Sequence, residues 1–553
     1  MFRLICLACC LSIVSVADAD ELKDLQTNAV SSRKCDAAHW GVVDGLYSSW
    51  TSHTNRLIPV YTFGTKGGGA GIDLSSYTDA NSVYRDRSRL QRLYRSDAEN
   101  TVDADAPYMD QTNVFDLQRA ALESGRKHVF VVVFDGMDWH TTRAASIWNL
   151  QRVAYDEGRG AGTHFQEYQA DGTTQYGWMV TSPASDGVQV DVNLQRVKNP
   201  GGGLAGGYNS RIGGAFPWSM PSVAEYLVAG PKEALVRHAY TDSAASATSM
   251  FCGIKTYNGA IGVGPQGQPA LSAAHLAQAK GYKVGAVTSV PISHATPAAT
   301  YAHNVHRDDY QDISRDLLGL PSISHPEQPL QGLDLLIGGG YGVEVQTDGS
   351  QGENFVPGNK YLTQSDLHAV DVANGGRYVV AQRTVGVPGA DGLMTAARQA
   401  VEKGARLLGF FGVFDQGSHG SGNLPFATAD RKYDPAPDAD GFTIAYQQAD
   451  LQENPALADM ASAALTVLAA DDSPFWLMVE AGDVDWANHA NNLDDSIGAV
   501  NSGDAAVRVI TDWVEQNSNW DESLLIVTAD HGHYLIIDRP ELLIRSGETT
   551  AQR

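Results

Sequence analysis

The chain has 553 residues, of which 43% are hydrophobic and 19% charged, and its formal net charge is −25 at pH 7. This balance is typical of a globular protein that can bury a sizeable core. No run of Lys or Arg forms a basic patch, which argues against nucleic-acid binding, because that binding depends on cations that neutralise phosphates. An acidic chain can still act on anions where bound divalent cations reverse the local charge.

The first 19 residues predict a secretory signal peptide. A short head ending at Arg3 precedes an apolar stretch over residues 4–16 and an Ala-Asp-Ala end at residues 17–19, which is the order of a cleavable export signal. The alternative is a buried N-terminal helix. The stretch is too short to span a bilayer, so we expect a secreted or periplasmic protein without a membrane span. Only Cys35 and Cys252 follow this segment, which permits at most one disulfide.

Residues 20–112 are expected to form an N-terminal extension or insertion of unknown role, and residues 113–553 a single catalytic domain. The stretch from about 41 to 112 is rich in Gly, Ser, Asp and Arg, and the stretches 338–378 and 415–450 are rich in Gly and Asp. The latter two contain few apolar runs. We therefore interpret all three as insertions or surface loops on one core rather than as separate domains.

Five short apolar runs predict buried parallel strands, because they are nearly continuous rather than alternating: residues 129–134, 284–290, 333–337, 475–479 and 524–529. Between them lie helical patterns over residues 272–280, 391–403 and 455–470. Strands that alternate with helices predict an α/β fold. We expect a three-layer αβα sandwich around a large, mostly parallel central sheet.

Polar residues follow several of these strands, at the edge where open α/β sheets place their sites. Asp135 follows the first run, Glu480 the fourth, and Asp530 with His531 the fifth. A single Asp in such a position is often a helix cap. Several carboxylates and imidazoles at several strand ends are better explained as ligands of divalent metals.

Asp485 and His489 lie four residues apart, shortly after Glu480. On a helix they share one face, one turn apart, and can bind one metal ion. The alternative is an ordinary pair on a helix surface, which the neighbouring Glu480 makes the weaker interpretation.

Ser243 is the strongest candidate nucleophile. It stands in TDSAASAT, residues 241–248, where Asp242 and Ser243 precede an Ala-rich helical stretch. A serine at a helix N-terminus benefits from free backbone N–H groups and from the positive end of the helix dipole, which stabilise an alkoxide or a phosphate. The alternative is that either residue only caps the helix. The following GIKTYNGAIGV, residues 253–263, favours the nucleophile.

With this segment the chain resembles the alkaline phosphatase family. Four further stretches resemble the metal and substrate motifs of that family in the same order: VVVFDGM at 131–137, SHATPAATYAHNVHR at 293–307, VEAGDVDWANHANN at 479–492 and TADHGH at 528–533. The resemblance extends from about residue 129 to 533. It implies an alkaline-phosphatase-like fold for this region.

The resemblance also implies two zinc ions and one magnesium ion. Its first zinc site would contain Asp485 and His489, its second Asp135, Asp530, His531 and Ser243, and its magnesium site Asp135, Thr296 and Glu480. Arg307 would grip two phosphate oxygens. Asp242, His294 and Trp486 are expected beside the bound substrate. His294 and Trp486 depart from the best-known enterobacterial family member, which has Asp and Lys there, and this affects the third metal and the phosphate pocket.

The implied reaction is hydrolysis of small phosphate monoesters through a phosphoserine on Ser243. The family is usually dimeric, so a homodimer is one option. The alternatives are a phosphodiesterase or sulfatase-like relative of the same superfamily, and a truncated, weakly active or non-catalytic metal- or phosphate-binding protein.

One ligand of the implied first zinc site is missing. The family supplies a histidine well downstream of the Asp-His doublet, but only 22 residues follow His531 here. The histidine among them, His533, is expected to lie too close to serve. We therefore predict a chain truncated after Arg553, with a histidine from elsewhere, such as His419, as the alternative.

Overall fold

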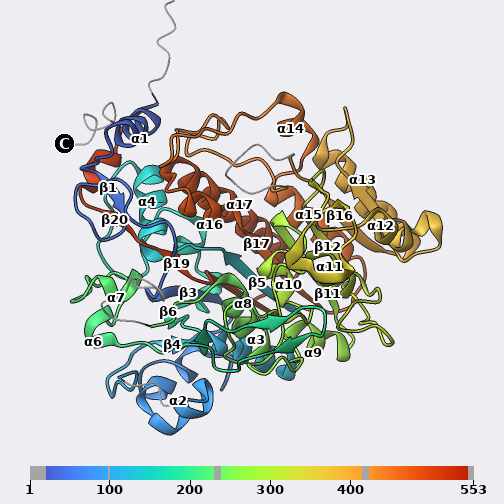
Figure 1. Cartoon of the computed structure of the whole chain (residues 1–553), viewed down its shortest axis with the longest axis horizontal. Helices are drawn as coiled ribbons and strands as arrows, with labels where there is room; N and C mark the ends of the chain where they lie inside the picture. The colour runs from blue at the N-terminus through green and yellow to red at the C-terminus, as the bar shows by residue number, and fades with distance from the viewer. Residues whose placement is uncertain (1–19, 97–99, 229–237, 414–421, 546–553) are drawn as a thin grey trace, which may run out of the picture.

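A computed structural model describes residues 20–96, 100–228, 238–413 and 422–545. The predicted signal peptide lies outside these residues. A ten-stranded sheet crosses the middle of the molecule, with helices on both of its faces (Figure 1). In spatial order its strands are β15 (Tyr378–Gln382), β16 (Arg406–Phe410), β12 (Leu335–Gly339), β11 (Lys283–Pro291), β17 (Phe475–Ala481), β5 (His128–Phe134), β18 (Ser523–Thr528), β3 (Ile58–Phe63), β6 (Gln175–Val180) and β4 (Met109–Asp110).

The sheet is mostly parallel, as predicted. Every neighbouring pair from β15 to β18 is parallel. β17 and β18 are buried along their whole length. Helices cover both faces of the sheet, so neither strand has a solvent-exposed face and polar residues do not alternate with apolar ones. The five predicted strands correspond to β5, β11, β12, β17 and β18. The predicted α/β fold class is confirmed.

Two layers of helices enclose the sheet. One contains α3 (Thr112–Ser124), α8 (Ser243–Cys252), α9 (Ala273–Ala279) and α10 (Ala295–Ala299), and the other contains α4 (Trp139–Leu150), α13 (Gly389–Lys403), α15 (Leu457–Leu468) and α17 (Leu493–Asn517). In Figure 1 α3 and α9 lie below the sheet and α17 above it. The three predicted helical patterns correspond to α9, α13 and α15.

Smaller elements surround this core. The helices among them are α1 (Glu21–Ser32), α2 (Arg87–Tyr94), α5 (His164–Glu167), α6 (Ser210–Gly213), α7 (Glu225–Val228), α11 (Tyr310–Leu318), α12 (Gln364–Val370), α14 (Gln448–Glu453) and α16 (Asp483–His489). Within the expected insertion at 338–378, β13 (Glu344–Val345) pairs with β14 (Gly358–Asn359) outside the central sheet. None of the helices in the described ranges is both long and apolar enough for a membrane crossing.

The N-terminal segment enters the sheet, which the sequence did not predict. β3 lies between β18 and β6 and runs antiparallel to both, and all of its residues are buried. The expectation of surface loops over residues 41–112 is therefore wrong for this strand. Just before it, β2 (His53–Thr54) pairs with β19 (Gly532–His533). This pairing fixes His53 beside the end of β18.

Candidate active site

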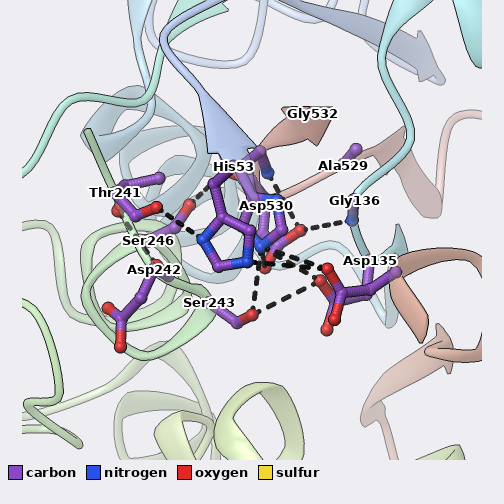
Figure 2. Close-up of polar contacts among 12 residues, drawn as sticks. His53, Asp135, Gly136, Thr241, Asp242, Ser243, Ser246, Ala529, Asp530 and Gly532 are labelled. Atoms are coloured by element: carbon purple, nitrogen blue, oxygen red, sulfur yellow. Dashed lines mark hydrogen bonds and ion pairs between the residues drawn. The ribbon is translucent and has the colours of Figure 1, made fainter. Parts of the chain in front are cut away.

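The predicted polar residues converge at the carboxyl ends of β5, β17 and β18. Asp135 follows β5, Glu480 lies near the end of β17, and Asp530 and His531 follow β18. Parallel strands end at the same edge of a sheet, so their terminal side chains meet there. Figure 2 shows His53, Asp135, Ser243 and Asp530 directed towards one another. They come from four separate segments of the chain.

Ser243 is the first residue of α8, and it is buried. Asp242 caps the helix, because its Oδ1 accepts a hydrogen bond from the backbone N–H of Ala245 at 2.9 Å. The capping interpretation is thus correct for Asp242, and Ser243 is left free to face the cluster. Its Oγ lies 3.1 Å from His531 Nε2 and 3.4 Å from Asp135 Oδ1.

Four ligand atoms surround one point next to Ser243. His531 Nε2 lies 3.3 Å from Asp135 Oδ1 and 3.4 Å from Asp530 Oδ2, in addition to its contact with Ser243 Oγ. Ligands of a tetrahedral ion with bonds of about 2.0–2.2 Å are about 3.3–3.6 Å apart. Asp530 Oδ2 has no hydrogen-bond partner, while Oδ1 accepts from the backbone N–H of Gly136 at 3.0 Å. These four residues fit a single divalent cation.

A second group contains His53, Asp485 and His489. His53 Nε2 lies 3.0 Å from His489 Nε2, and Asp485 Oδ1 lies 3.7 Å and 3.5 Å from these two nitrogens. His53 Nδ1 is 2.9 Å from the carbonyl oxygen of Thr241, and His489 Nδ1 is 2.6 Å from that of Thr51. A carbonyl only accepts, so each Nδ1 carries the proton and each Nε2 presents a lone pair to the other.

Two lone pairs that face each other at 3.0 Å repel unless a cation lies between them. The burial of His53 lowers its pKa well below the ordinary value, and the neighbouring His531 and His489 add to this effect. A proton on His53 is therefore disfavoured at neutral pH. The donor set of two imidazoles and one carboxylate suits zinc.

His533 belongs to the same region but has a different contact. Its Nε2 lies 2.9 Å from Asp485 Oδ1, which is the distance of a direct hydrogen bond. A donated hydrogen bond of this kind orients a metal-binding carboxylate. Burial alone would raise the pKa of Asp485, but the neighbouring His489 and His533 outweigh it and hold that pKa well below its ordinary value.

A third group is made of oxygen atoms. Asp135 Oδ2, Thr296 Oγ1 and Glu480 Oε1 are all buried and have no hydrogen-bond partner. The hydroxyl of Thr288 donates to the other carboxylate oxygen of Glu480. Burial raises the pKa of Glu480 to about 7, against the opposing effect of the Thr288 hydroxyl. Unpartnered buried carboxylates carry a large desolvation cost, which a bound cation removes. An all-oxygen set suits magnesium.

Burial also raises the pKa of Asp135 well above its ordinary value, and the nearby carboxylates of Asp530, Asp485 and Glu480 add to this rise. Without cations these four acids would repel one another in a buried space. The electrostatics of the cluster and the distances between its ligand atoms therefore both favour bound divalent cations.

Arg307 lies beside Asp242, the residue that precedes Ser243. Its Nη1 donates to Asp242 Oδ2 at 3.1 Å, and 19% of its side chain is exposed. Burial alone would lower the pKa of Arg307, but the Asp242 carboxylate outweighs it and raises that pKa. The guanidinium is thus charged and held in place, with other N–H donors available for an anion.

His294 and Trp486 lie in contact, with ring centroids 5.6 Å apart and an angle of 88° between the rings. Burial lowers the pKa of His294 to about 3, and Arg307 contributes to the decrease. His294 is therefore neutral, and its Nδ1 has no partner.

The structure brings together every predicted metal residue and also His53 and His533. The sequence reasoning missed His53 because it expected the third ligand downstream of the Asp-His doublet and named His419 as the alternative. A histidine immediately before a short apolar stretch, SHTNRLIPVYTF at 52–63, was the available signal. The expectation that His533 lies too close to be the third ligand stays a prediction; its contact in the structure is with the Asp485 carboxylate. His419 lies outside the described residues.

The structure thus places a buried serine at a helix N-terminus, beside candidate metal-binding groups at the carboxyl edge of a parallel sheet. This arrangement is typical of metal-dependent α/β enzymes. The family model "Alkaline phosphatase" matches residues 222–542, which is more than half of the chain. The chain belongs to the alkaline phosphatase family.

Several curated relatives are similar to the chain. Alkaline phosphatase 3 of Bacillus subtilis is 27% identical over 291 residues, which cover 53% of this chain and 49% of the relative. The repressible alkaline phosphatase of Saccharomyces cerevisiae is 30% identical over 301 residues, covering 53% and 45%. Alkaline phosphatase of Escherichia coli is 28% identical over 315 residues, covering 54% and 60%. The chain thus spans about half the length of the curated relatives it matches.

Solved structures are similar as well. A cold-active alkaline phosphatase from a psychrophilic Shewanella species has 20% identity and a TM-score of 0.41, covering 73% of this chain and 68% of that one. The alkaline phosphatase of Thermus thermophilus has 21% identity and a TM-score of 0.42, covering 74% and 60%.

Proposed function

We propose that this protein hydrolyses phosphate monoesters through a phosphoserine intermediate on Ser243 and releases inorganic phosphate. The observation that carries the proposal is the set of contacts around Ser243 Oγ, which lies 3.1 Å from His531 Nε2 and 3.4 Å from Asp135 Oδ1. Membership of the alkaline phosphatase family supports the reaction class.

The three ligand groups would hold two zinc ions and one magnesium ion. The first zinc site would comprise His53, Asp485 and His489, so that the third ligand comes from the N-terminal segment. The second would comprise Asp135, Ser243, Asp530 and His531, and the magnesium site Asp135, Thr296 and Glu480. Divalent ions held there would supply electrostatic stabilisation for the attacking and leaving oxygens.

Ser243 would act as the nucleophile. Its position at the start of α8 provides backbone N–H groups and the positive end of a helix dipole, which favour the alkoxide and the bound phosphoryl group. The hydroxyl of Ser246 donates to the backbone carbonyl of Asp530, which ties the first turn of α8 to the segment that bears Asp530 and His531. The nucleophile and its neighbours are thereby held in one geometry.

Arg307 would bind two oxygens of the phosphoryl group. Asp242 positions it through the 3.1 Å contact, and the planar guanidinium offers further parallel N–H donors for bidentate binding. His294 and Trp486 would line the same pocket. Displacement of the alcohol by Ser243, followed by displacement of Ser243 by water, would give net retention at phosphorus.

Three further assignments accompany this proposal: small phosphomonoesters as substrates with no nucleic-acid partner, export through the 1–19 segment, and a homodimer. They rest on composition, on the N-terminal pattern and on the family.

The test is an assay of the full chain on chromogenic phosphate monoester, phosphate diester and sulfate at basic pH, with and without a chelator. We expect preference for the monoester, loss of turnover with chelator and recovery when zinc and magnesium are restored. Preference for the diester or the sulfate would replace this proposal by the corresponding alternative. Turnover that survives both chelation and Ser243→Ala would overturn it.

A further inference from the structure

A second group of potential ligands lies outside the serine site. His303 stands in the turn after α10, Asp316 is on α11, and His325 follows α11. One ligand atom from each lies within 4.8 Å of the others. Asp316 and His303 are buried, and 17% of the His325 side chain is exposed. None of these residues takes part in the site described above.

The contacts on the outer nitrogen of each ring determine the protonation of both imidazoles. His303 Nε2 lies 2.9 Å from the carbonyl oxygen of Ala270, so this nitrogen carries a proton and Nδ1 is bare. His325 Nδ1 lies 3.1 Å from Asp316 Oδ1, so in the neutral ring the proton is on Nδ1 and Nε2 is bare. Burial lowers the pKa of His303, which favours the neutral ring.

Asp316 is held as an acceptor. Its Oδ1 accepts from the hydroxyl of Ser322 at 2.5 Å, and its Oδ2 accepts from the backbone N–H of His303 at 3.0 Å. Donors therefore reach both of its oxygens, and the carboxylate acts on His325 as a fixed hydrogen-bond acceptor.

The two bare nitrogens, His303 Nδ1 and His325 Nε2, face each other at 3.3 Å. Two ligands of a tetrahedral ion with metal–nitrogen bonds of about 2.0–2.1 Å are about 3.3–3.4 Å apart, so the separation fits a shared ion. The outer contacts of the two rings, one to a backbone carbonyl and one to a carboxylate, are those that metal-binding histidines usually make.

We propose that His303 and His325 bind a divalent transition-metal cation of the zinc type, with Asp316 orienting His325. Imidazole ligands select this class over magnesium and calcium. The exposed side of His325 provides the entry path and leaves the remaining coordination positions open to water.

Such an ion would connect the segment after α11 to the turn that carries Arg307. His303 and Arg307 are four residues apart, and between them Asn304 donates to Asp309 Oδ2 at 2.7 Å. An additional link at His303 would stiffen this turn. The ion would therefore support the phosphate-binding arginine without touching the serine site.

The test compares the wild-type chain with His325→Ala, and with His368→Ala as the matched control, because His368 is an exposed histidine on α12. Each protein is equilibrated with zinc and passed through a desalting column, and its metal content is measured by elemental analysis. We expect His325→Ala to lose about one equivalent of zinc per chain and His368→Ala to lose none. Zinc-edge anomalous diffraction from the wild type should give a peak between His303 Nδ1 and His325 Nε2.

Equal zinc content in the wild type and His325→Ala, together with no anomalous peak at this position, would overturn the proposal in favour of a proton shared between the two rings. Thermal unfolding of each variant shows whether a loss of zinc comes from misfolding. His303→Ala serves as a second variant of the same site. Because the readout is the metal count, it does not depend on phosphatase activity. Loss of turnover in all proteins would count against the proposed function and leave this inference testable.

Discussion

Replacing His53 with alanine is expected to weaken zinc binding at the Asp485 and His489 group by roughly 10²–10³-fold. Zinc binding to a four-ligand protein site is worth about 10–16 kcal/mol, so one ligand contributes about 2.5–4 kcal/mol on average. Each 1.4 kcal/mol corresponds to about tenfold in affinity. His53 Nε2 lies 3.0 Å from His489 Nε2 and 3.7 Å from Asp485 Oδ1, so under the proposal it would share one ion with both.

The assay is zinc competition against a chelating dye, followed by turnover of a chromogenic monoester at limiting and at excess zinc. Turnover of His53→Ala should collapse at limiting zinc and recover in part at excess. His39→Ala is the matched control, because His39 is a buried histidine of the same N-terminal segment that contacts Asp538. It should retain the zinc affinity of the wild type.

His533→Ala discriminates between the two candidates for the third ligand. If His533 only orients Asp485 through the 2.9 Å contact, its loss should cost about 10–100-fold in metal affinity, which is less than the loss of His53. Unchanged zinc affinity in His53→Ala, combined with a larger loss in His533→Ala, would refute the reasoning and make His533 the ligand.

Ser243→Ala should lower kcat by at least about 10³-fold with the fold intact, since the nucleophile is removed; wild-type kcat would exclude the phosphoserine route. Arg307→Lys should lower kcat/KM by about 10–100-fold, because a bidentate charge-assisted pair worth about 1.5–3 kcal/mol is replaced by a single contact. Steady-state kinetics measure this decrease. An unchanged kcat/KM would show that Arg307 does not bind the substrate. Burial raises the pKa of Asp309 to about 8, above the unfolded value of 3.8. The folded state therefore keeps a proton that the unfolded state releases, and stability falls as pH rises from about 4 to about 8. Relative to Asp309→Asn, the wild type should lose at most roughly 5 kcal/mol of its free energy of unfolding between pH 4 and pH 8. Urea unfolding of both proteins at the two pH values measures this loss. The same pH dependence in the wild type and the variant would contradict the raised pKa.

The parallel core could be predicted because its signals are local. Runs such as 129–134 and 475–479 are apolar on both faces, and a carboxylate directly after them marks the edge where the site forms. Asp135, Glu480 and Asp530 were found in this way. Thr296 and Arg307 were found only through the family resemblance, because neither a threonine in a short helix nor an arginine in a turn has a distinctive local pattern.

β3 and His53 could not be predicted on the same basis. β3 is only six residues long and contains Pro59, which lacks a backbone N–H and argues against an interior strand. Its partner, β18, begins 460 residues after β3 ends. Pairing between strands so far apart cannot be predicted from either segment alone, because the hydrophobic pattern of a strand does not identify the strand it pairs with.

The position of β3 affects how the chain can fold during synthesis. β3 can pair with β6 early, but its other edge meets β18, which the ribosome makes 460 residues later. At about 5–20 residues per second, that interval lasts roughly 25–90 s. During that time an apolar strand with open N–H and C=O groups is available to other chains. Nascent molecules of this protein should therefore need a holding chaperone until β18 has been synthesised.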